Sequence, residues 1–133
     1  MDYSKLLETA IEAQQFAYAP YSNFRVGAAL LTKGGKVYTG CNVENQSFGA
    51  TVCAERIAIF KAVSEGERDF TAMAVTGSTG KYTPPCGICR QVISEFAPDI
   101  SLVLHDQQEG MKVVKAGTLF PHRTNYLNKT RPK

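Results

Sequence analysis

Three cysteines and one glutamate lie in two short stretches whose spacing is typical of a catalytic zinc site. Cys53 is followed two residues later by Glu55, and Cys86 and Cys89 form a Cys-x-x-Cys pair further along the chain. Three thiolates can bind one Zn²⁺ and leave its fourth tetrahedral position for water. A carboxylate beside that water can accept and return protons. The pattern therefore predicts hydrolytic zinc chemistry with Glu55 as the acid–base group.

Two other uses of these cysteines have to be weighed. Cys86 and Cys89 alone would equally suit a redox pair or half of a structural zinc knuckle, but neither of these requires Cys53 followed by Glu55. A fourth thiolate from Cys41 would close the coordination sphere and make the protein a non-catalytic zinc-binding module. A lone cysteine at the end of an apolar strand is more often a small buried hydrophobe, so we expect Cys41 not to bind the metal.

Composition favours one ordinary globular domain spanning residues 1–133, with a loosely ordered tail after about residue 125. The 133 residues are 44% hydrophobic and 20% charged, and the formal net charge of +3 is too small to indicate a nucleic-acid partner. No apolar run is long enough to cross a membrane, and the first residues lack the features of a secretory signal. We therefore expect a cytoplasmic protein whose cysteines stay reduced.

Apolar spacing and turn residues predict an α/β fold. The expected helices cover about 4–18, 52–64 and 86–97, and the expected strands 24–32, 37–39, 70–76, 100–104 and 112–115. A hairpin followed by β-α-β units indicates a single mixed β-sheet of about five strands with helices packed on its faces. Thr51 is the expected N-cap of the second helix. The cysteines then fall at two helix starts, whose partial positive charge favours thiolates.

Four segments resemble the cytidine deaminases in their order and spacing. The segments are 19–30, 40–45, 53–56 and 85–92, and the resemblance extends from about residue 5 to residue 105. The three-cysteine pattern with its glutamate is the known signature of zinc-dependent nucleobase deaminases in its all-cysteine form. The resemblance implies a short, homotetrameric enzyme with the three-layer fold of that family. It would convert cytidine and 2′-deoxycytidine to the uridine forms in pyrimidine salvage and release ammonia.

The resemblance also implies roles for individual residues. Cys53, Cys86 and Cys89 would bind one Zn²⁺, and Glu55 would move the protons. The ring of Phe24 would pack on the pyrimidine, and the backbone N–H of Ala54 would face the base carbonyl. Asn42 and Glu44 would hold the sugar hydroxyls. From residue type alone, Phe24 could instead belong to the core, and Asn42 and Glu44 could be solvated loop residues.

Charge balance at the metal singles out one further residue. Three thiolates and one Zn²⁺ form a net negative centre, which the two helix starts offset only in part, each acting as roughly half a positive charge. Arg56 follows Glu55 directly, and its guanidinium could hydrogen-bond to the ligand sulfurs. Arg90, directly after Cys89, is the rival for this task.

Two departures from the family pattern and three alternative functions remain. Phe48 stands where many relatives have Tyr, and no aromatic residue follows 119–121 directly, where the family often has one that reaches a neighbouring subunit. One alternative is a deaminase of another aminated nucleoside, such as a blasticidin-type antibiotic, which Glu44 in the 42–45 loop disfavours. The others are a non-catalytic zinc module and a polynucleotide editor, the latter disfavoured because there is no basic stripe.

Overall fold

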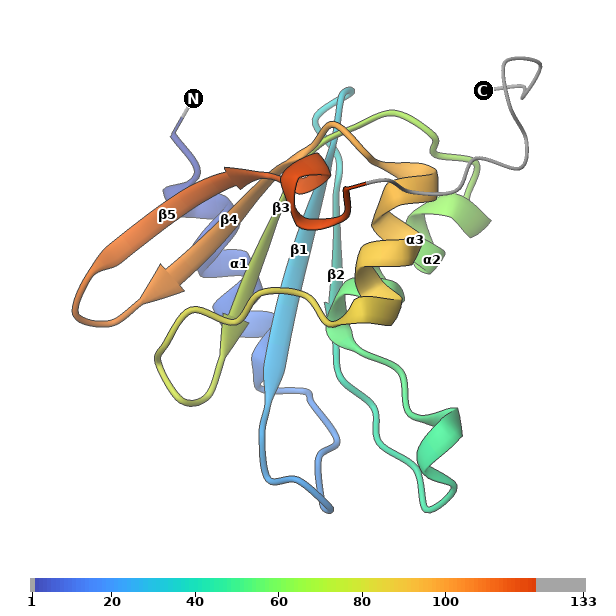
Figure 1. Cartoon of the computed structure of the whole chain (residues 1–133), viewed down its shortest axis with the longest axis vertical. Coiled ribbons are helices and arrows are strands. Elements are labelled where there is room, and N and C mark those ends of the chain that lie inside the picture. Colours follow the sequence, from blue (N-terminus) through green and yellow to red (C-terminus); the bar gives the residue numbers. More distant parts are fainter. Residues whose placement is uncertain (1, 122–133) are drawn as a thin grey trace.

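The computed structural model describes residues 2–121, which form one five-stranded mixed sheet between two layers of helices (Figure 1). The elements are α1 (Ser4–Gln14), β1 (Val26–Thr32), β2 (Val37–Cys41), the 3₁₀ turn η1 (Phe48–Ala50), α2 (Ala54–Ser64), β3 (Phe70–Gly77), α3 (Gly87–Phe96), β4 (Ser101–Asp106), β5 (Gly110–Lys115) and the 3₁₀ turn η2 (Ala116–Leu119). The strand order is β2-β1-β3-β4-β5. Only β3 and β4 pair in parallel, while the other neighbours are antiparallel. The predicted mixed α/β fold is confirmed.

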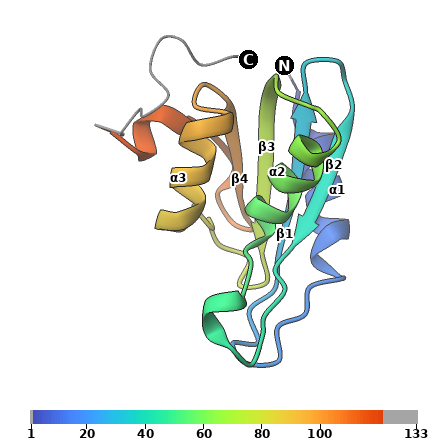
Figure 2. The same ribbon diagram turned by 90° about the vertical axis from the view of Figure 1, so that its right-hand side faces the viewer.

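Helices cover both faces of the sheet, so its central strands are buried on both sides (Figure 2). The larger core lies under α2 and α3 and includes Leu30, Ile59, Met73 and Leu102. The smaller core lies under α1 and is built largely from alanines of α1, β1 and β3. This double burial explains why β1 and β3 are nearly continuous apolar runs rather than alternating ones.

Two glycines let the helices approach the sheet closely. A Cβ on Gly27 would lie 2.0 Å from the carbonyl oxygen of Ala10 in α1, and a Cβ on Gly40 would lie 2.2 Å from that of Ala54 in α2. Backbone atoms cannot turn aside as a flexible side chain can. Gly40 therefore sets how near the first turn of α2 lies to β2.

Several boundaries differ from those expected. The first helix ends at Gln14 rather than near residue 18, because the backbone of Tyr18 pairs with the loop that follows β2, where its N–H donates to Asn42 O at 2.9 Å. Thr51 does not cap α2, since the N-cap is Cys53 and Thr51 closes η1. The expected loose tail after residue 125 lies outside the described residues. No helix within residues 2–121 is long and apolar enough to cross a membrane.

We expect Gly40→Ala to lower the free energy of unfolding by about 2 kcal/mol or more, since overpacking a rigid contact typically costs about 1–3 kcal/mol. Gly49→Ala is the matched control, because a Cβ there would meet nothing within 4 Å. Denaturant unfolding at one saturating zinc concentration measures both variants. Equal midpoints for the two variants would contradict the close approach of α2 to β2.

Candidate active site

The sulfur atoms of Cys53, Cys86 and Cys89 all lie within 4.8 Å of one another, and all three cysteines are free. Cys53 is the N-cap of α2 and Cys86 the N-cap of α3, while Cys89 lies in the first turn of α3. The Cys53 and Cys86 sulfurs are 3.7 Å apart. Two thiolates bound to one tetrahedral Zn²⁺ at about 2.3 Å are separated by about 3.8 Å. The cluster therefore fits a zinc ion.

Cys41 lies outside this cluster, at the end of β2 and opposite Gly27 of β1. Within residues 2–121, the three clustered cysteines are the side chains that lie close enough together to hold a metal. Cys41 and His105 are not part of this group. Partial burial raises the pKa of the Cys41 thiol. The coordination sphere that the protein provides is thus open at one position.

Hydrogen bonding within the cluster favours a thiolate at Cys53. The Cys89 thiol donates to the Cys53 sulfur and, with help from Arg56 and Cys86, lowers the pKa of Cys53 to about 5. The same bond, together with burial, raises the pKa of Cys89. A bound metal ion would deprotonate the coordinating thiols outright.

Glu55 lies in the first turn of α2, only 3% exposed, directly beside the cysteine cluster in sequence. Burial raises the pKa of its carboxyl to about 7, with a smaller contribution from the charge on Cys53. A group that titrates near neutrality is suited to general acid–base catalysis. The neighbouring Ala54 is fully buried at the first position of α2, where a backbone N–H has no partner within the helix.

The structure brings Arg56, and not Arg90, to a cysteine sulfur. The Arg56 guanidinium donates to Cys53 Sγ at 3.5 Å. Its Nε is buried and has no hydrogen-bond partner among the described residues. Arg90 instead donates to the carbonyl oxygens of Pro85 at 2.8 Å and Leu119 at 3.2 Å, and so ties η2 to the start of α3. Arg56 is therefore placed to offset the charge of the thiolates.

Asn42 has a structural role that its sequence context did not indicate. Its side chain is 8% exposed and bridges the start of β1, where Oδ1 accepts from the Val26 N–H and Nδ2 donates to the Phe24 carbonyl oxygen, both at 2.8 Å. One N–H and one lone pair remain for a ligand. Phe24 is half-buried, and a Cβ on Gly77 would lie 2.8 Å from its Cζ, so the ring lies against bare backbone.

Glu44 is held by the loop that precedes β1. Its carboxylate accepts from the backbone N–H groups of Tyr21 at 2.9 Å and Ser22 at 3.1 Å, and from the Ser22 hydroxyl. The hydroxyl bond is the largest of the effects that lower the pKa of Glu44. The carboxylate therefore stays ionised and can only accept further hydrogen bonds. Sequence analysis missed Ser22, and its position two residues before Phe24 was the available signal.

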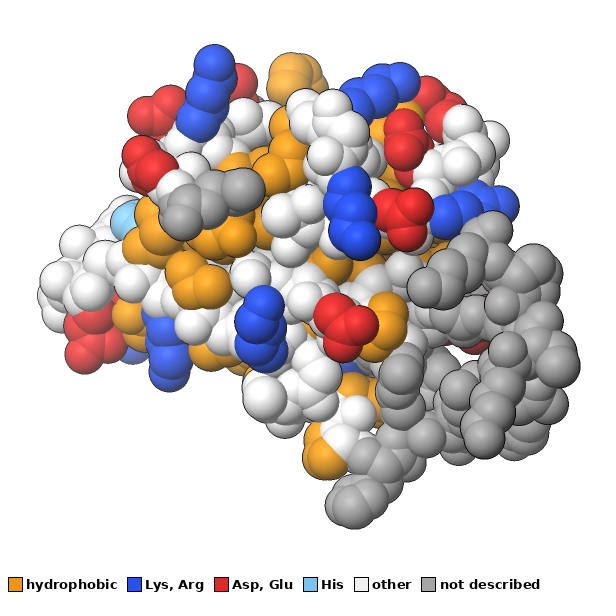
Figure 3. Space-filling view, turned by 90° about the horizontal axis from the view of Figure 1, so that it is seen from above, with side chains coloured by type: hydrophobic (Ala, Val, Ile, Leu, Met, Phe, Trp, Pro, Cys, Tyr) orange, Lys and Arg blue, Asp and Glu red, His pale blue; other side chains and the backbone are white. Residues whose placement is uncertain are grey.

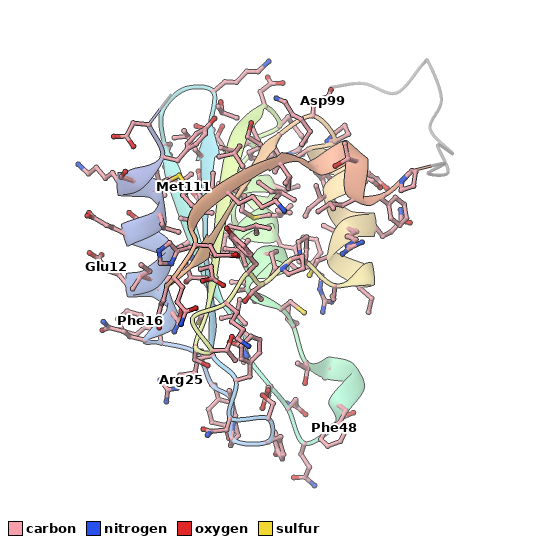
Figure 4. The ribbon with its side chains drawn as sticks, turned by 60° about the vertical axis from the view of Figure 1, so that its left-hand side comes forward. Glu12, Phe16, Arg25, Phe48, Asp99 and Met111 are labelled. Atoms are coloured by element: carbon pink, nitrogen blue, oxygen red, sulfur yellow. The ribbon has the colours of Figure 1, made fainter. Side chains whose placement is uncertain are left out.

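A cavity of about 380 Å³ lies beside Glu44, lined by Tyr21, Ser22, Glu44, Phe48 and Thr51. Phe48 lies on η1 at the far end of the arm that follows β2 (residues 42–52), away from the sheet (Figure 4). Its ring is 74% exposed and meets Tyr21 edge-on, with 5.7 Å between the centroids. The segments flanking β1 and β2 thus form an open, partly aromatic hollow.

The family model described as the cytidine and deoxycytidylate deaminase zinc-binding region matches residues 1–104, which include every residue of the cysteine cluster. The chain belongs to this deaminase family. Cytidine deaminase of Halalkalibacterium halodurans is 49% identical over 122 residues, which are 91% of this chain and 92% of the relative. The crystal structure of cytidine deaminase from Burkholderia pseudomallei has a TM-score of 0.88 at 49% identity, covering 93% of this chain and 100% of that one. Blasticidin-S deaminase of Bacillus cereus is more distant, at 37% identity over 108 residues, 75% of this chain and 76% of the relative.

The family match and the cysteine geometry together identify the cofactor of this deaminase. The matched region is a zinc-binding one, and the three clustered cysteines have the spacing that Zn²⁺ requires. The cofactor is one Zn²⁺ per chain.

We expect Cys41→Ser to retain about one zinc per chain, because Cys41 lies apart from the cysteine cluster. Cys86→Ser is the matched loss-of-ligand variant and should retain far less zinc after dialysis against a weak chelator. Elemental analysis of the purified proteins gives the metal content. Loss of zinc from Cys41→Ser would show that the open-site geometry is wrong.

We expect Arg56→Gln to release zinc to a chelator several-fold faster than the parent, because the Cys53 sulfur loses its charged donor. Outer partners of metal ligands commonly affect metal affinity by about 10–100-fold. Arg90→Gln is the control, since Arg90 donates to backbone carbonyls instead. A colorimetric zinc indicator follows the release. Identical rates for the parent and Arg56→Gln would remove Arg56 from the support of the metal.

Proposed function

We infer that this chain is a zinc-dependent hydrolase that deaminates cytidine and 2′-deoxycytidine to uridine and 2′-deoxyuridine, with release of ammonia. The observation that carries the inference is the buried carboxyl of Glu55, placed at the same helix start as a three-cysteine cluster that fits Zn²⁺. The named function of relatives at 49% identity agrees with it. The reaction consumes one water and exchanges the amino group on C4 of the pyrimidine for oxygen.

Cys53, Cys86 and Cys89 would hold the zinc, which when bound lowers the pKa of water towards neutrality. Glu55 takes the proton from the attacking water and delivers it to N3 of the pyrimidine. It then takes the second proton from the hydroxyl now on C4 and supplies it to the amino group, so that C4 becomes a carbonyl and ammonia leaves. Burial of Glu55 serves this exchange, because a carboxyl that titrates near 7 both accepts and donates readily at neutral pH.

We further propose the substrate contacts. The Phe24 ring packs on the pyrimidine, and the free N–H of Ala54 donates to the base carbonyl. Asn42 and Glu44 hold the sugar hydroxyls, Asn42 through its remaining N–H and lone pair and Glu44 as an ionised acceptor. Support comes from the bonds that fix both side chains beside the start of β1, so that little ordering is left for binding.

A blasticidin-type substrate is the second candidate, since a blasticidin-S deaminase is among the relatives. The lower identity of that relative and the ionised Glu44 in the open cavity favour a substrate with free sugar hydroxyls. A polynucleotide fits less well, because the face in Figure 3 intersperses acidic with basic side chains and the net charge is only +3.

Mixing the protein with cytidine should give the ultraviolet change of uridine formation and an equal amount of ammonia. We expect Glu55→Gln to keep its zinc while its turnover falls by at least about 10²–10⁴-fold, since an amide cannot carry the protons. Zinc content and nucleoside binding serve as the controls for folding. No reaction from the zinc-loaded parent would reject the proposed function, and parent-like turnover in Glu55→Gln would reject its mechanism.

We propose that the chain forms one deaminase domain over residues 1–133, acts in the cytoplasm and assembles as a homotetramer. Support for assembly comes from large apolar side chains exposed on the arm, on the loop before β1 and on the helices that bear the cysteines. These are Phe48 at 74%, Ile88 at 61%, Tyr21 at 51% and Phe60 at 45% exposure. A second copy covering them would remove apolar area from water and help enclose the open cavity.

Light scattering should therefore give a mass near four times 14.5 kDa. The specific activity should fall on dilution if neighbouring subunits complete the cavity. A monomer that remains fully active at nanomolar concentration would contradict the proposed assembly.

A further inference from the structure

The hydroxyl of Ser22 joins two of the proposed substrate residues. Its oxygen accepts from the backbone N–H of Phe24 at 3.0 Å, and its proton is donated to Oε2 of Glu44. The backbone N–H of Ser22 donates to the other carboxylate oxygen, Oε1, at 3.1 Å. Ser22 therefore bonds at the same time to the residue assigned to the base and to the residue assigned to the sugar.

The direction of these bonds is set by chemistry. A backbone N–H can only donate and an ionised carboxylate can only accept, so the hydroxyl must accept from Phe24 and donate to Glu44. The Tyr21 N–H also donates to Oε1, at 2.9 Å. Ser22 alone of these donors reaches Oε2, and without its hydroxyl the carboxylate would be held by one oxygen only.

We propose that Ser22 is a positioning residue that sets the sugar selectivity of the enzyme by holding Glu44 ready to accept a hydrogen bond from a sugar hydroxyl. The proposal rests on the proposed function, in which Glu44 contacts the sugar. Ser22 and Glu44 both line the 380 Å³ cavity, and Ser22 is exposed to it. A nucleoside that lacks the 2′- and 3′-hydroxyls offers the oriented carboxylate no donor from the sugar ring and binds less well.

The role of Ser22 is confined to binding. The cysteine cluster and Glu55 lie at the starts of α2 and α3, whereas Ser22 lies in the loop before β1. Loss of its hydroxyl should therefore change KM and leave kcat nearly unchanged. A general disturbance of the fold would lower kcat and zinc content as well.

The experiment compares cytidine with 2′,3′-dideoxycytidine in the parent and in Ser22→Ala. We expect KM for cytidine to rise about tenfold, the scale of a lost hydrogen bond to a charged group, with kcat within about twofold of the parent. Loss of the bond to the Phe24 N–H acts on both nucleosides alike, because they share the base, so the ratio of their KM values isolates the effect on Glu44. We expect this ratio to narrow by up to about tenfold. Ser22→Thr keeps a hydroxyl and should restore the discrimination.

Ser78→Ala is the matched control. The Ser78 hydroxyl accepts from the Arg25 N–H at 3.0 Å, which is the same kind of anchor one residue further along, but it has no bond to Glu44. This variant should keep the discrimination of the parent. If the parent discriminates between the two nucleosides, the role of Ser22 would be overturned by a Ser22→Ala variant that is equally selective, or by a Ser78→Ala variant that loses as much selectivity. Either result would leave the role of Glu44 standing. A parent that does not discriminate would reject the sugar contact of Glu44, and the role of Ser22 with it.

Discussion

The convergence of two helix N-termini is the constraint on which the chemistry of this protein depends. α2 follows β2 and α3 follows β3, and both helices pack on the same face of the sheet (Figure 2). Their first residues meet closely enough to bring three sulfurs within 4.8 Å. Since each helix start carries partial positive charge, the place where they meet is electrostatically suited to thiolates. The close contact between Gly40 and the first turn of α2 fixes one half of this arrangement.

Charge and burial are balanced within one turn of α2. Cys53 belongs to the cysteine cluster, Ala54 is buried at the first helical position, Glu55 is buried and Arg56 reaches back to the Cys53 sulfur. Burial disfavours the charged form of Glu55, while the guanidinium of Arg56 offsets the negative charge of the sulfur beside it. A single helical turn thus carries a cysteine of the cluster, a guanidinium that offsets the charge of its sulfur and a carboxyl with a pKa raised towards neutrality.

The substrate side of the site is held in a different way. The loop before β1 and the arm after β2 contribute little to the apolar cores and are fixed instead by side-chain hydrogen bonds to backbone. Asn42 and Glu44 provide most of these bonds, and they are also the residues proposed to meet the sugar. Because such bonds are individually modest, this part of the molecule is expected to open more readily than the helix starts.

Local spacing in the sequence determined the chemistry. Cys86 and Cys89 share one helical turn, and Cys53 and Glu55 share another, so residues three apart or closer are positioned by the helix itself. The order of the elements and the mixed sheet were also predictable, because apolar runs and glycine turns act over a few residues. The family resemblance supplied roles for Phe24, Asn42 and Glu44 that spacing alone did not distinguish from loop and core residues.

Tertiary structure decided what depends on residues far apart in the chain. Only the folded chain separates Cys41 from the cluster, and only there does Arg56 reach a sulfur while Arg90 turns to the backbone of η2. The bond from Ser22 to Glu44 spans 22 residues, and the bonds of Asn42 to Phe24 and Val26 span 18 and 16. Such contacts depend on how β1 and β2 pair and on where the chain leaves α1. No periodicity or local motif encodes these features, because they arise only when distant segments pack together.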